Sequence, residues 1–182
     1  MAETPVLKIE NAQIIFRNLA GRKTMYNAEG NRNFCLLLDE EVAHQMERDG
    51  WNIKHLRPRE EGDTPKPYLP VAVSYKNRPP RVLLLTSKGR TLLTEDVVEF
   101  VDLVDIDFVD VTVRPYNWDV SGRQGVKAYV QTMYVKVRED PLDLKYADVE
   151  EITMDGRSLE AGPQTPELEA GEPHEIIEGD WR

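Results

Sequence analysis

An arginine and two aromatic residues alternate along one short stretch of the chain, as Arg114, Tyr116 and Trp118. Side chains of a β-strand point to opposite faces with period two, so these three share a face while Val111 and Val113 share the other. Aromatic rings stack on flat ligands and arginine attracts anions, a combination typical of sequence-tolerant sites for single-stranded nucleic acids. A strand aromatic is also often a half-buried packing residue, so the stripe by itself leaves binding and packing open.

A second apolar run follows the polar loop 119–125, and the two runs together predict a β-hairpin. In the second run Lys127 and Tyr129 alternate with valine and alanine, so they fall on one face and the small apolar residues on the other. The predicted hairpin therefore carries a cationic and aromatic face built from both of its arms.

The phase of the second arm changes after Gln131, because Met133 and the valines that follow it become the apolar set. A β-bulge near Gln131 or Thr132 explains the change, since one extra residue re-aims every later side chain. Tyr134 lies beyond this point and is left out of the predicted site. Bulges favour curved sheets and barrels.

Basic loops are the expected source of phosphate contacts. From Lys76 to Arg90 the chain carries five bases and no acid, and its prolines and glycine put these bases on turns. The loop after residue 18 is also basic. Any one of these residues has the alternative of being an ordinary solvated loop side chain. The predicted contacts outside the hairpin are Arg22, Lys23, Arg78, Arg81, Lys88 and Arg90.

The elements that must position these side chains are mostly short strands. Alternation over residues 7–17 predicts an opening strand with an irregularity near Asn11, and a helix is expected between Asp39 as N-cap and Gly50. Further strands are expected at 33–38, from Trp51, at 68–75 and at 82–85, and a short helix is expected from Thr94. This pattern predicts a mainly β chain, folded as a curved, antiparallel barrel like the oligonucleotide-binding (OB) fold with one packing helix.

Charge divides the chain unevenly. Residues 1–138 hold 20 Lys and Arg against 19 Asp and Glu, whereas residues 139–182 hold 3 against 14. The overall charge of −10 therefore comes from the end of the chain and does not argue against binding a polyanion. We expect a binding domain over 1–138, an acidic appendage over 139–152 and a disordered acidic tail over 153–182.

The tail ends with a few apolar residues among acids, namely Ile176, Ile177 and Trp181. Such side chains on an acidic tether could form a peptide motif for a protein partner, or could have no role. Association between copies of the chain is also left open.

Catalytic patterns are missing. The histidines, His44, His55 and His174, lack metal-ligand spacing, and the chain has no phosphate-binding glycine loop and no Gly-x-Ser-x-Gly. Cys35 lies in an apolar run and is expected to be a small core residue. We therefore expect no enzyme activity, no cofactor and no metal. The chain also lacks an apolar run long enough to span a membrane, so a soluble protein of the bacterial cytoplasm is expected.

Five short segments stand out together, at 32–34, 49–52, 114–119, 125–130 and 133–135. In combination they resemble a family of bacteriophage and prophage replication proteins regarded as single-stranded DNA-binding proteins. The similarity covers about residues 8–148 and implies an OB barrel that protects single strands in phage replication or recombination. The tail is similar in kind to the partner-recruiting tails of bacterial single-strand binders, but it ends Asp180-Trp181-Arg182 instead of with a terminal aromatic.

Two other functions remain open from the sequence. An acidic interaction module, such as a DNA mimic or host-factor inhibitor, would present the aspartates around residues 102–110 as one exposed face. A metal-dependent nuclease would use Asp102, Asp105 and Asp107, although no complete calcium-loop pattern accompanies them. The main hypothesis is a non-catalytic, sequence-tolerant single-stranded DNA-binding protein, with bases stacking on Tyr116, Trp118 and Tyr129.

Overall fold

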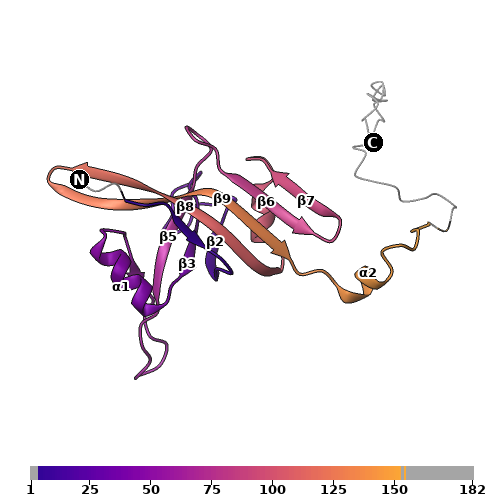
Figure 1. Cartoon of the computed structure of the whole chain (residues 1–182), viewed down its shortest axis with the longest axis horizontal. Coiled ribbons are helices and arrows are strands. Elements are labelled where there is room, and N and C mark those ends of the chain that lie inside the picture. The colour runs from indigo at the N-terminus through magenta and orange to yellow at the C-terminus, as the bar shows by residue number, and fades with distance from the viewer. Residues whose placement is uncertain (1–3, 153, 155–182) are drawn as a thin grey trace, which may run out of the picture. The chain divides into compact units, whose positions relative to one another are not determined.

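Strands dominate the computed structural model, which describes residues 4–152 and 154 (Figure 1). Contacts divide the chain into two units, residues 1–144 and 145–182, and the sheet belongs to the first. The strands are β1 (Leu7–Ile9), β2 (Ile14–Asn18), β3 (Arg32–Leu37), β4 (Lys54–His55), β5 (Pro67–Val73), β6 (Arg81–Thr86), β7 (Gly89–Leu93), β8 (Ile106–Val120) and β9 (Arg123–Val137). The helices are α1 (Glu40–Arg48), the 3-10 helix η1 (Val98–Asp102) and α2 (Pro141–Lys145).

These strands form one sheet in the order β1-β8-β9-β5-β3-β2, to which β4 adds beside β5, and β6 and β7 add through β9. The predicted mainly β class with a packing helix is confirmed. Two details differ from the prediction. The sheet is mixed, because β9 runs parallel to both β5 and β6. Among the described strands no pairing joins β2 to β1, so the sheet is not closed into a barrel by hydrogen bonds.

The two ends of the sheet are nevertheless neighbours in sequence. β1 pairs with β8 and β2 pairs with β3, and only residues 10–13 separate them. This link bonds to both sides, since Ala12 N donates to Val109 O at 2.7 Å and Leu37 N donates to Gln13 O at 2.9 Å. Asn11 within it has a φ of 50°, which confirms the predicted irregularity. The opening segment thus turns from one edge of the sheet to the other.

The β8–β9 hairpin is longer than the sequence predicted. Its two strands have fifteen residues each and are joined at Ser121-Gly122, where both residues have positive φ as a two-residue hairpin turn requires. The register shifts where Thr112 pairs with Thr132 and Val113 pairs with Val130. Gln131 is therefore the extra residue, and the predicted bulge is confirmed.

The core lies under the inner face of this sheet. It contains alternate residues of β5, β8 and β9, together with Leu19, Val98 and Val101. Helix α1 contributes Met46 to this cluster. The helix begins after Asp39 and ends before Gly50 as expected, although the Asp39 side chain makes no capping hydrogen bond.

Three smaller predictions were wrong. The strand expected from Trp51 is reduced to β4, because Trp51 itself is a buried core residue that bridges to Val126. The helix expected from Thr94 is the later 3-10 helix η1. Cys35 is not in the core, since it lies between buried Phe34 and Leu36 and so points to the outer face of β3.

In the second unit the described residues are 145–152 and 154. Lys145 places its Nζ 5.1 Å from the centroid of the Tyr146 ring, a cation–π contact within the acidic segment. The predicted partner motif, Ile176, Ile177 and Trp181, lies outside the described residues.

Glu139 connects the end of β9 to the turn between β6 and β7. Its carboxylate accepts hydrogen bonds from Ser87 N at 2.9 Å, from Ser87 Oγ at 2.7 Å and from Lys136 Nζ at 2.9 Å. The hydrogen bonds from Ser87 and Lys136 lower the pKa of Glu139 to about 2. The turn is thus fastened to the strand by an acid that stays ionised well below its ordinary range.

This depressed pKa sets a pH window. A carboxyl group whose pKa is lower in the folded state stabilises the fold fully above its unfolded pKa, here 4.5, and loses that effect as the pH falls toward about 2. We expect the Ser87 amide NMR signal to titrate near pH 2. In Glu139→Gln, which cannot ionise, the stability deficit against wild type should shrink between pH 5 and pH 2. A Ser87 midpoint near the ordinary glutamate value would contradict this assignment.

Candidate nucleic-acid interface

The five hairpin residues predicted to bind share one face of the sheet, as their pairings show. Arg114 pairs with Tyr129, Tyr116 with Lys127, and Trp118 with Gly125, while the alternating partners Val113 and Val130 are buried in the core. The period-two argument therefore put these side chains on the correct, outer face. We call Arg114, Tyr116, Trp118, Lys127 and Tyr129 the hairpin site.

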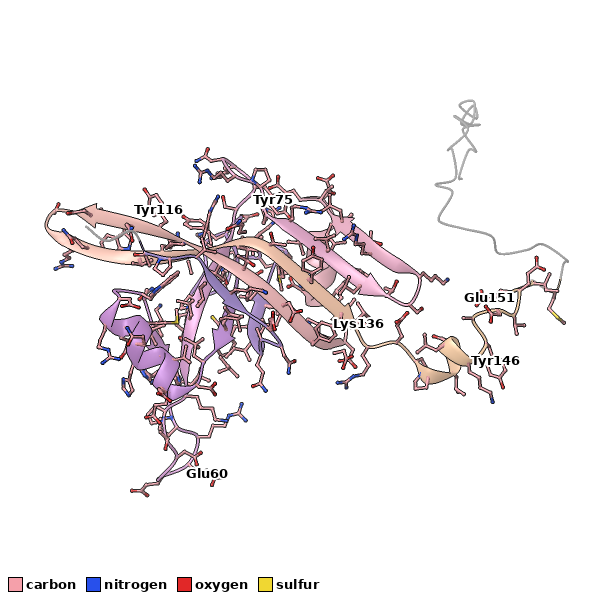
Figure 2. The ribbon with its side chains drawn as sticks, in the orientation of Figure 1. Glu60, Tyr75, Tyr116, Lys136, Tyr146 and Glu151 are labelled. Carbon is pink, nitrogen blue, oxygen red and sulfur yellow. The ribbon has the colours of Figure 1, made fainter. Side chains whose placement is uncertain are left out.

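Tyr129 lies at the centre of the hairpin site. Its ring meets that of Tyr116 edge to face, with centroids 6.1 Å apart and an interplanar angle of 86°. The Arg114 guanidinium carbon lies 5.7 Å and Lys127 Nζ lies 5.1 Å from the Tyr129 centroid. Tyr116 is 57% exposed, and Figure 2 shows it on the projecting hairpin. Rings and cations are thus assembled at the surface rather than packed into the core.

Trp118 is held differently. Its indole lies over Gly125, where an added Cβ would come within 2.7 Å of Cζ2. Trp118 is half-buried, so part of its side chain remains accessible to a ligand. Gly125 is needed for a close approach here, and Gly125→Ala would displace the indole.

The bulge does not remove Tyr134 from the outer face. Tyr134 pairs with Asp110, which lies between buried Val109 and Val111, so its side chain is on the same face as the hairpin site. It was left out of the predicted site for a reason that the structure contradicts. Tyr134 is half-buried, because β6 runs beside it and pairs Leu83 with it.

The long basic stretch from Lys76 to Arg90 is divided by β6. Arg81 begins β6 opposite Thr132, near the hairpin site, and β6 then runs parallel to β9 until Leu85 lies opposite Lys136. Arg90 of β7 pairs with Leu85, at the end of β6 that lies away from Arg81. Four residues of strand separate the two ends, about 13 Å at 3.3 Å per residue. The sequence thus grouped bases that the fold separates.

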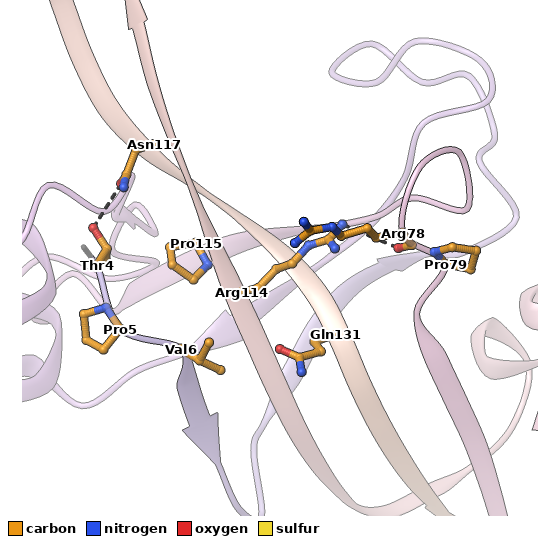
Figure 3. A pocket seen from close by; sticks show the side chains of 9 residues that line it. All are labelled: Thr4, Pro5, Val6, Arg78, Pro79, Arg114, Pro115, Asn117 and Gln131. Carbon is orange, nitrogen blue, oxygen red and sulfur yellow. Dashed lines mark hydrogen bonds between the residues drawn. The ribbon is translucent and has the colours of Figure 1, made fainter.

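Arg78 joins the hairpin site directly. It lines an open hollow of about 620 Å³ together with Arg114, and Arg114 Nη2 makes a long hydrogen bond of 3.5 Å to the Arg78 carbonyl (Figure 3). Thr4 donates to Asn117 Oδ1 at 3.0 Å across the other side of this hollow. The remaining lining residues are Pro5, Val6, Pro79, Pro115 and Gln131. Two guanidinium groups therefore face one hollow beside Tyr129.

Arg22 and Lys23 are exposed on the loop between β2 and β3. Asn27 organises this loop, since its Nδ2 donates to the carbonyls of Arg22, Ala28 and Asn31 at 2.9–3.0 Å. The two bases lie at the surface, on a loop that belongs to neither arm of the hairpin.

Two of the four aspartates around residues 102–110 hold backbone N–H groups. Asp102 accepts hydrogen bonds from the backbone N–H groups of Leu19 and Ala20, both at 2.9 Å, and Asp110 accepts one from Asn11 N at 2.8 Å. These two acids fasten the opening segment to η1 and β8. Among the described residues, no group of three or more His, Cys, Asp or Glu side chains is placed to hold a metal ion.

Two aromatic residues of the outer face were missed. Phe16 is one of the apolar residues in the alternating stretch 7–17, but the register shifts between Ile15 and Asn18, and Phe16 is 63% exposed. Its ring meets Tyr68 of β5 edge to face, with centroids 6.2 Å apart. Tyr68 could have been found, because it alternates with the buried residues Leu69 and Val71. Phe16 had no such signal.

Comparison with known proteins assigns the chain to a family. The family model described as "Putative phage ssDNA-binding domain" matches residues 2–179. The chain belongs to this family. No curated protein sequence matches it significantly. Membership confirms the resemblance to phage single-stranded DNA-binding proteins that the sequence showed.

Solved structures of phage single-stranded DNA-binding proteins are similar to the chain at low identity. The protein from bacteriophage Enc34 in complex with ssDNA matches with 12% identity and a TM-score of 0.49, over 75% of this chain and 88% of that chain. Its C-terminal truncation matches with 13% identity and a TM-score of 0.47, over 75% and 87%. The gp2.5 protein of bacteriophage T7 matches with 12% identity and a TM-score of 0.33, over 86% and 98%.

Proposed function

We propose that the protein binds single-stranded DNA with little sequence preference, through the outer face of the β8–β9 hairpin. The observation that carries the proposal is the Tyr129 ring, which lies against Tyr116 with Arg114 and Lys127 over it. Every base has a π-face, so stacking on such rings does not depend on sequence. Cations beside the rings supply phosphate contacts, and membership of the family supports the same ligand.

The strand order supports an OB-type framework for this site. The segment 7–18 pairs with β8 at its start and with β3 at its end, and β5 lies parallel to β9. An OB fold is a five-stranded, partly open barrel that presents a strand face and two flanking loops to oligonucleotides. In this framework β6 and β7 are additions beside β9.

The proposed role is protection of single strands during phage replication or recombination in the bacterial cytoplasm, without a catalytic step. Within the described residues, no helix is long and apolar enough to cross a membrane. Recruitment of a replication or recombination protein by the acidic tail, through Ile176, Ile177 and Trp181, is a separate part of the proposal. Deleting residues 153–182 should then remove partner binding and leave DNA binding in place.

An oligonucleotide titration tests the main proposal. We expect a labelled single strand of about 30 nucleotides to bind at low salt, and log K to fall against log salt by about 0.7 per phosphate contact. A duplex of equal length should bind more weakly, since its bases are already stacked on one another. No binding at low salt, or equal affinity for the duplex, would overturn the proposal.

The mimic and nuclease alternatives gain no support from particular contacts. A mimic needs a continuous acidic face, whereas Asp102 and Asp110 are engaged with backbone N–H groups. A nuclease using Asp102, Asp105 and Asp107 predicts cleavage of an oligonucleotide with magnesium or manganese. We expect the oligonucleotide to remain intact.

A further inference from the structure

A second aromatic pair occupies the outer face of the same sheet, away from the hairpin. Phe16 and Tyr68 meet edge to face with centroids 6.2 Å apart and an interplanar angle of 74°, close to the geometry of Tyr116 and Tyr129. Lys54 lies directly opposite Tyr68 in the pairing of β4 with β5, as Lys127 lies opposite Tyr116 in the hairpin. Two edge-to-face pairs, each with a neighbouring lysine, are thus built on one sheet.

Phe16 has no role in the core that would explain its position. It is 63% exposed, and its φ of 52° is a left-handed conformation that a bulky side chain rarely adopts. Strain of this kind persists only where the surroundings impose it, and it is found at binding sites. The bulge between Ile15 and Asn18 uses this conformation to lay the ring beside Tyr68.

The outer face of β5 links the two pairs. Ala72 of β5 is paired with Tyr129 of β9 and with Asn33 of β3, so the outer face extends from the hairpin across β5. From Ala72 to Tyr68 the outward residues of β5 are small or compact, with Pro70 between them and Cys35 beside Pro70. Four residues of strand span about 13 Å. The two pairs are thus separated by a short stretch of outer face with no large side chain of β5 between them.

We propose that Phe16 and Tyr68, with Lys54, form a second base-stacking site, and that one bound strand crosses the sheet from the hairpin site over β5 to β2. This inference rests on the proposed single-stranded DNA binding and extends it from the hairpin to the sheet. The strand then occupies a longer site than the hairpin alone offers, and shortening the oligonucleotide or removing either pair weakens binding.

The test uses Phe16→Asn, because asparagine tolerates positive φ far better than phenylalanine. The variant should keep or raise the melting temperature while its Kd for an oligothymidylate of about 30 nucleotides rises about 5- to 150-fold, the loss expected for one stacked base. If the ring were only packing, the melting temperature would fall and Kd would stay within about two-fold, and that result would overturn the second site.

Two variants of Tyr68 complete the test. Tyr68→Ala should weaken binding by a similar factor, whereas Tyr68→Phe keeps the ring and should bind as wild type. An oligonucleotide too short to reach from one pair to the other can occupy only one of the two sites at a time. The losses of binding free energy caused by Phe16→Asn and Tyr129→Ala should therefore add for the long oligonucleotide but not for the short one. If wild type binds and Tyr129→Ala weakens binding but both Phe16→Asn and Tyr68→Ala bind normally, the second site is wrong and the hairpin site stands. If wild type itself does not bind, the proposed function fails with it.

Discussion

Replacing Tyr129 by alanine is expected to raise the Kd for a single strand of about 30 nucleotides by about 5- to 150-fold, or ~1–3 kcal/mol for one stacked base. Tyr129 is chosen because it is the ring that Tyr116, Arg114 and Lys127 all contact. Its removal takes away a stacking face and also the support that orders the two cations. Fluorescence anisotropy with a labelled oligonucleotide measures the effect.

Two matched variants separate stacking from general damage. Tyr129→Phe keeps the ring and should stay within about two-fold of wild type, because stacking does not need the hydroxyl group. Tyr146→Ala removes an exposed tyrosine from the second unit and should leave Kd unchanged. If Tyr129→Ala binds like wild type, the tyrosine is a packing residue of the hairpin and the proposed site is misplaced.

The second large effect is expected on the salt dependence of binding. The double variant Arg78→Gln, Arg114→Gln removes the two guanidinium groups that line the hollow beside Tyr129. If each contacts one phosphate, the slope of log K against log salt should become shallower by about 1.4, since each contact to a single strand contributes about 0.7. Affinity should fall most at low salt, where phosphate contacts contribute most. Titrations at four or more salt concentrations give the slope.

A charge-matched control uses the division of the basic stretch. Lys88→Gln, Arg90→Gln removes the same two charges from the far end of β6 and β7, about 13 Å of strand away from Arg81. We expect a smaller change of slope in this variant. Equal losses in both would mean that the bound strand also reaches the β6–β7 turn, and the separation seen in the fold would not matter for binding.

Patterns of a few neighbouring residues predicted much of the fold. The side-chain period of two is a property of any extended backbone, so the alternation of valines with Arg114 and Tyr116 was enough to assign the hairpin faces. The phase change after Gln131 located the bulge in the same way, because one inserted residue shifts every later side chain. Helix α1 was bounded by Asp39 and Gly50, which mark its ends locally.

The same patterns did not predict which face of β2 and β3 is buried. The bulge that turns Phe16 outward depends on how β2 fits against β3, and nothing in the residues around it marks the shift. Cys35 sits in an apolar run that reads as core, yet its strand is covered on one side only, so it faces outward. In both cases the neighbouring strand, and not the residue itself, decides which side is buried.

By itself the sequence determined the mainly β class, the faces of the hairpin and the concentration of acidic charge after residue 138. These follow from backbone geometry and composition, which act over a few residues. Only the tertiary structure decided which loops meet the hairpin. In the fold Arg78 lies beside Arg114, whereas Lys88 and Arg90 lie at the far end of β6. The rings of Phe16 and Tyr68 are in contact, although β3 lies between their strands. Such contacts depend on strand order and register, and segments distant in the chain establish these only when they pair.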